Sequence, residues 1–141
     1  MPRLSVWMVR VALAHLVLGF AIGALLLAWR ATPPGPELLA RLRPLHIELL
    51  LLGWIVNLGF GVGYWILPAR ADGGGRSADA LVGTAFVLLN AGVLLTGLGP
   101  VSGDTSPLPL LGRMAEAAAA AAFAAHAWAR IRPYGAGRSV S

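Results

Sequence analysis

The chain has 141 residues, of which 57% are hydrophobic and 12% charged, and its mean hydropathy is +0.74. Soluble domains carry about twice that share of charged residues, so the composition excludes an ordinary soluble protein and predicts a membrane protein. Cysteine is absent, which excludes disulfides, thiolate metal sites and iron–sulfur ligation. The formal net charge is +5, but the arginines stand at segment ends rather than in clusters with aromatic residues, so we expect no nucleic-acid partner.

Four apolar segments are long enough to cross a lipid bilayer, which takes about 20 helical residues. They cover about 10–29, 45–67, 80–99 and 110–129, and Pro- or Gly-rich stretches separate them. We therefore predict an all-α fold: an integral membrane four-helix bundle over residues 1–132, with a disordered tail over 133–141.

The arginines predict how this bundle lies in the membrane. The side that carries both termini would hold seven of them, at positions 3, 10, 70, 76, 130, 132 and 138, and the other side four, at 30, 41, 43 and 113. Positive charge is enriched on the cytoplasmic side, which favours cytoplasmic N and C termini. We expect a prokaryotic cytoplasmic membrane, and a first segment that is retained as a helix rather than cleaved as a signal peptide.

Polar and small residues recur at helical spacing within these segments. His15, Gly19 and Gly23 repeat every four residues in the first, and Gly-x-x-x-Gly favours close approach of a second helix. In the second segment, His46, Gly53, Asn57 and Tyr64 form a stripe whose successive members are seven, four and seven positions apart. At about 100° per residue the stripe stays within roughly 20° of one line, whereas Glu48 falls on nearly the opposite face.

Depth in the membrane divides the three histidines of the chain. His15 and His126 each lie a short way in from the same membrane side, beside Arg10 and Arg130, so they could share a site. His46 is predicted near the opposite surface, level with Glu48, Arg113, Met114 and Glu116. A metal centre of all three histidines within one subunit is not expected.

The second segment resembles the corresponding helix of the haem-copper oxidase and nitric oxide reductase catalytic subunits. It presents a His near its start, an apolar run, a Gly-rich stretch, an aromatic pair and a final Pro, here His46, Gly53-Trp54, Gly59, Gly61, Gly63, Tyr64-Trp65 and Pro68. The resemblance covers about 25 residues well. It implies that His46 is an axial ligand of a low-spin haem. The chain has 3 histidines and four predicted segments, so it lacks the ligands for that family's binuclear centre.

The resulting hypothesis is a small membrane protein that binds haem b, for electron transfer or for binding and sensing NO or O₂. A second His46 across a homodimer, or Met114, would supply the other axial ligand. Arg41, Arg43 or Arg113 would pair with the propionates, while Gly53 and Asn57 complete the predicted site. A respiratory-chain or other redox partner would then be expected, and the residues give no independent support for catalysis.

Four alternatives remain open. A haem could be held by His15 and His126 on the inner side. Copper or zinc could bind His46, Glu48 and Glu116, although Glu48 points away from His46 on a regular helix. The chain could be an accessory or assembly subunit without a cofactor, which packs by its Gly faces. A channel or transporter is the fourth alternative, but no inverted repeat or broken helix stands out.

Overall fold

The computed structural model describes residues 1–31, 37–68, 75–103, 105–128 and 130–131, and these residues form helices and short connections with no strand among them. Four stretches of helix are long and apolar enough to cross a membrane, which confirms the all-α prediction. The predicted tail, 133–141, lies outside the described residues.

The first of these stretches is α1 (Arg3–Ala31), and the short α2 (Glu37–Ala40) follows it. The second is a continuous helix with three parts, α3 (Arg43–Glu48), the π-helical segment η1 (Leu49–Val56) and α4 (Asn57–Ile66). The third is α5 (Gly75–Leu98), which continues into the 3₁₀ turn η2 (Gly99–Val101). The fourth is α6 (Leu108–Trp128).

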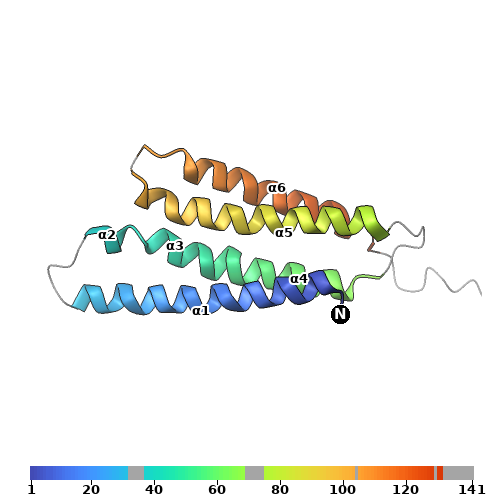
Figure 1. Ribbon diagram of the computed structural model, residues 1–141, viewed down its shortest axis with the longest axis horizontal. Helices are drawn as coiled ribbons and strands as arrows, with labels where there is room; N and C mark the ends of the chain where they lie inside the picture. The colour runs from blue at the N-terminus through green and yellow to red at the C-terminus, as the bar shows by residue number, and fades with distance from the viewer. Residues whose placement is uncertain (32–36, 69–74, 104, 129, 132–141) are drawn as a thin grey trace, which may run out of the picture.

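The helices are arranged as two antiparallel pairs (Figure 1). The continuous helix α3–η1–α4 lies along α1, and α6 lies along α5. The start of α1 and the end of α6 are at the same end of the bundle, as an even number of helix crossings requires.

The first helix begins earlier than its sequence predicts. It starts at Arg3 rather than near residue 10, so Arg10 is inside the helix, with its guanidinium 5.9 Å from the centroid of the Trp7 ring. Such an arginine can cover an aromatic ring while its charged end reaches water. His15 consequently lies near the middle of α1, which is deeper than its distance from Arg10 indicates.

The continuous helix α3–η1–α4 is called the second crossing below. Its π-helical segment η1 changes which neighbouring helix its side chains face. A π-helix closes its hydrogen bonds over five residues instead of four, so each residue advances by less than the 100° of a regular helix. His46 and Gly53 contact α1, but Asn57 contacts Asn90 of α5. The residues of the predicted stripe therefore contact different helices, α1 at His46 and Gly53 and α5 at Asn57.

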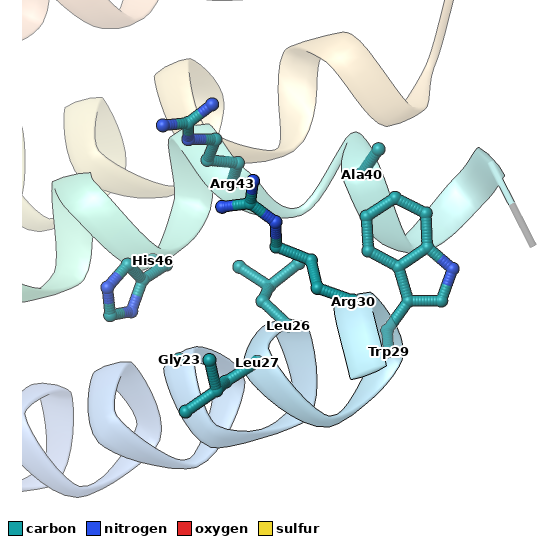
Figure 2. Close-up of a pocket in the computed structure, with 8 residues that line it drawn as sticks. All are labelled: Gly23, Leu26, Leu27, Trp29, Arg30, Ala40, Arg43 and His46. Atoms are coloured by element: carbon teal, nitrogen blue, oxygen red, sulfur yellow. The ribbon is translucent and has the colours of Figure 1, made fainter. Parts of the chain in front are cut away.

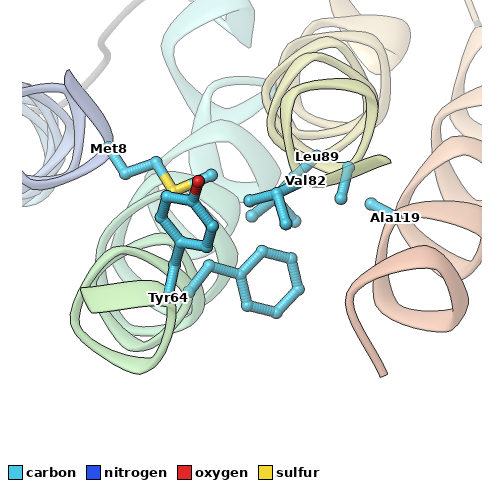
Figure 3. Close-up of a cluster of buried hydrophobic side chains, with 7 residues drawn as sticks. Met8, Tyr64, Val82, Leu89 and Ala119 are labelled. Atoms are coloured by element: carbon cyan, nitrogen blue, oxygen red, sulfur yellow. The ribbon is translucent and has the colours of Figure 1, made fainter. Parts of the chain in front are cut away.

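The larger apolar core lies where all four crossings meet, in the half of the bundle nearest the start of α1. Figure 3 shows Met8 of α1 and Tyr64 of α4 beside Val82 and Leu89 of α5 and Ala119 of α6. Against this core the rings of Phe60 and Phe123 stack, with centroids 4.0 Å apart. A smaller core of Leu45, Leu49 and Val93 fills the other half. These cores fix the second crossing between α1 and α5, and thus the position of its histidine.

Candidate functional site around His46

His46 of α3 is held against the backbone of α1. Its Nδ1 atom is 2.8 Å from the carbonyl oxygen of Gly19. Because a carbonyl oxygen only accepts hydrogen bonds, Nδ1 carries the proton, and in the neutral ring the lone pair is on Nε2. The described structure gives the ring no second hydrogen bond. A metal-binding histidine commonly has this arrangement, with one nitrogen donating to a carbonyl and the other available to a metal.

Glycine makes the close approach of this ring possible. A Cβ atom at Gly23 would lie 2.6 Å from Cε1 of His46, too close for any real side chain. A Cβ at Gly19 would lie 2.6 Å from a methyl carbon of Leu50. The predicted close-contact motif Gly19-x-x-x-Gly23 is therefore confirmed, since it seats the start of the second crossing on α1.

A cavity of about 490 Å³ opens beside the His46 ring, between the end of α1 and the start of the second crossing (Figure 2). This volume is in the range of sites for small organic ligands. Its wall is apolar apart from the histidine and two arginines; the lining residues are Gly23, Leu26, Leu27, Trp29, Arg30, Ala40, Arg43 and His46. Arg30 and Arg43 have no acidic partner within the described ranges. The cavity therefore joins apolar walls to two positive charges.

His15 makes a similar hydrogen bond, but its ring lies away from the cavity that opens beside His46. Its Nδ1 atom is 2.9 Å from the carbonyl oxygen of Gly53, and the side chain is buried between α1 and η1. His15 does not border the cavity beside His46. We therefore assign it to helix packing.

His126 lies at a different level of the bundle from His15. Its ring centroid is 5.6 Å from that of Tyr64, in the core near the start of α1. His15 is level with Gly53, and the stretch of helix from Gly53 to Tyr64 is roughly 15 Å long. The structure does not bring these two histidines together, because α1 starts at Arg3 and so carries His15 farther along the bundle.

The other predicted cofactor residues are dispersed. Met114 is exposed on α6, whereas the His46 ring is turned toward α1. Arg41 donates a hydrogen bond of 3.2 Å to the carbonyl oxygen of Pro100. Asn57 donates one of 3.3 Å to Asn90. Of the three predicted propionate partners, Arg43 alone lines the cavity.

Arg113 forms ion pairs with two buried carboxylates. Its guanidinium nitrogens are 2.5 Å from Oε1 of Glu48 and 2.9 Å from Oε2 of Glu116. Thr96 of α5 donates a hydrogen bond of 3.1 Å to the other oxygen of Glu116. The predicted level of Glu48 with Arg113 and Glu116 is confirmed by these contacts.

The same contacts bear on the copper or zinc alternative. Glu48 is directed to α6 and His46 to α1, so the structure does not assemble the set of His46, Glu48 and Glu116. Among the described residues no group of three or more histidine, aspartate or glutamate side chains is placed to hold a metal ion.

Sequence reasoning missed five residues of the cavity wall: the polar Arg30 and Trp29, and the apolar Leu26, Leu27 and Ala40. Arg30 is seven residues beyond Gly23, the spacing that also relates His46 to Gly53. This spacing predicts that Arg30 lies on the same helix face as Gly23. Trp29 has a buried indole nitrogen that lacks a hydrogen-bond partner in the described part of the chain. No signal in the sequence distinguishes this tryptophan from one at a membrane interface.

Comparison with known proteins adds no relative to this description: no protein-family model, no curated protein and no solved structure matches the chain. The fold therefore defines only a class, an all-helical bundle with four helices of membrane-spanning length and composition. Any assignment of function depends on the cavity beside His46.

Proposed function

We propose that this chain is an integral membrane protein that binds haem b, with His46 as an axial ligand. The observation that carries the proposal is the hydrogen bond from His46 Nδ1 to Gly19, which directs the proton away from Nε2 at the edge of a cavity. Haem iron binds neutral imidazole nitrogen readily. The bound haem would supply one-electron transfer or the binding of a diatomic gas.

The rest of the cavity suits the other parts of a haem. Leu26 and Leu27 offer apolar surface to a porphyrin. Arg30 and Arg43, which both line the cavity, would pair with the two propionates, since arginine binds carboxylates through paired hydrogen bonds. Arg30 takes the role that the sequence led us to expect of Arg41 or Arg113, both of which bond elsewhere.

We propose that the second axial ligand of the haem comes from another molecule, either a second copy of the chain or a bound gas. Met114 of the same chain is exposed on α6, away from the His46 ring. A second copy of His46 in a symmetric dimer remains the candidate for an electron carrier. An open position would instead suit a sensor or carrier of NO or O₂.

We also propose that the four long helices cross a prokaryotic cytoplasmic membrane, with both chain ends on the cytoplasmic side. The arginine distribution supports this orientation. The cavity would then face the outer side of the membrane, where a respiratory-chain or other redox partner could reach the haem.

The test is the absorption spectrum of the detergent-purified protein, expressed with haem supplied and recorded oxidised and reduced. We expect a Soret band that is lost in His46→Ala and retained in His15→Ala. The control is closely matched, because both histidines donate through Nδ1 to a glycine carbonyl but only His46 borders the cavity. A colourless wild-type protein would refute the proposal and favour a cofactor-free accessory subunit. A band that survives His46→Ala but not His126→Ala would move the haem to the inner side.

A further inference from the structure

The buried cluster of Glu48, Arg113 and Glu116 contains one more negative charge than it can neutralise. Two carboxylates share a single guanidinium, so with all three groups ionised the cluster has a net charge of −1. Glu48 is 4% exposed and Glu116 is 7% exposed. An uncompensated charge among apolar helices costs several kcal/mol or more unless it finds a counter-charge or is neutralised.

The hydrogen bonds show which carboxylate lacks a partner. Glu116 has both oxygens engaged, one by Thr96 and the other by Arg113. Glu48 has Oε1 bonded to Arg113, whereas its Oε2 is buried and has no hydrogen-bond partner among the described residues. Oε2 of Glu48 is therefore the unpartnered position of the cluster.

The helices around Glu48 offer it no further positive charge. Residues 80–98 of α5 include no charged residue, and α5 contributes the hydroxyl of Thr96. Between Arg10 and Arg30, α1 has one titratable residue, His15, which is bonded to Gly53. On α3, Arg43 lines the cavity beside His46 and forms no ion pair with Glu48 in the described part of the chain, and His46 is bonded to Gly19 on the α1 side. Arg113 is the cation that contacts Glu48, and it also serves Glu116.

We propose that Glu48 carries a proton in the folded protein at neutral pH, so that Glu48, Arg113 and Glu116 together form a binding site for one exchangeable proton. The proton adds to Oε2 of Glu48 and makes the cluster neutral; its release restores the charge of −1. A neutral carboxyl group with one unpaired oxygen costs far less to bury than an unpaired charge. The side chain of Arg113 is 56% exposed, so one side of the cluster lies at the surface of the bundle rather than in its core.

Infrared spectroscopy of the full-length protein in liposomes tests the proposal directly. We expect wild-type protein at neutral pH to show the carbonyl band of a protonated carboxylic acid, shifted in ²H₂O. The band should be lost in Glu48→Gln and kept in Glu37→Gln, whose carboxyl group is exposed on α2. No such band in the wild type, or a band that persists in Glu48→Gln, would overturn the proposal.

Unfolding provides a second, independent reading. Glutamine closely imitates a protonated glutamate and need not take up a proton on folding, so Glu48→Gln should leave the unfolding midpoint at neutral pH unchanged or raise it. Glu116→Gln should lower it, because the ionised partner of Arg113 is then removed. If Glu48→Gln lowers the midpoint as far as Glu116→Gln does, Glu48 is an ionised counter-ion and the proposal fails. Neither measurement requires haem, so both results are independent of the proposed haem site.

Discussion

Gly53 lies so close to His15 that a Cβ atom at this position would be 2.7 Å from the Nδ1 atom of the histidine. The same two residues share the hydrogen bond from the ring to the Gly53 carbonyl oxygen. The contact between α1 and η1 therefore depends on the absence of a side chain at residue 53.

Gly53→Ala should consequently destabilise the bundle. An added methyl group must push the helices apart or displace the ring, and overpacking of this kind costs about 1–3 kcal/mol. Gly59→Ala is the matched control in the same crossing, because nothing lies within 4 Å of its added Cβ; alanine there should be neutral or stabilising by up to about 1 kcal/mol. Reversible unfolding in mixed micelles measures both. Equal losses in the two variants would contradict the packing explanation.

Gly23→Ala should weaken haem binding more than it weakens the fold. The new Cβ would meet Cε1 of His46 and turn the ring away from its present position. We expect the Soret absorbance per protein to fall several-fold while circular dichroism shows the helices intact. Gly83→Ala, with open space around its Cβ, should keep full absorbance. Unchanged haem content in Gly23→Ala would argue against His46 as the ligand.

Thr96→Val should cost about 1 kcal/mol of unfolding free energy, the usual size of a hydrogen bond between membrane helices. It removes the hydroxyl that donates to Glu116 while it keeps the shape of the side chain. Thr84 is a control on the same helix, since its hydroxyl is exposed and bonds to Ala80 one turn before it. Thr84→Val should change stability by less than about 0.5 kcal/mol. The prediction fails if the two variants are equally stable.

Asn57 and Asn90 should be energetically coupled. Asn57 is fully buried and donates to Asn90, whose own amide donates to the carbonyl oxygen of Phe86 at 2.7 Å. Each alanine variant should cost about 1–2 kcal/mol, because it removes a hydrogen bond between a buried and a half-buried side chain. In a double-mutant cycle the two losses should fall short of additivity by at least about 0.5 kcal/mol. Strict additivity would show that the pair does not contribute as a unit.

Residue type and spacing were sufficient to predict the four long helices, the close approach of another helix at Gly19 and Gly23, and the shared level of Glu48 and Arg113. These features depend on composition and on the regular rise of a helix. The π-helical segment was not predictable, because an apolar run such as Leu49–Val56 is equally compatible with α-helical hydrogen bonds. The position of His15 was misjudged for a related reason: Arg10 can extend along the helix surface, so a charged residue does not mark a helix start.

The ion pairs of Arg113 bear on how the protein is made. Helix α6 is the least apolar of the four long helices, and it carries both Arg113 and Glu116. Charged residues of this kind oppose the entry of a single helix into lipid. Their partners, Glu48 and Thr96, belong to helices that are synthesised earlier. If the helices span a membrane, as we propose, the partners of α6 would already be in place when α6 is made, and ion pairing would help to guide its insertion.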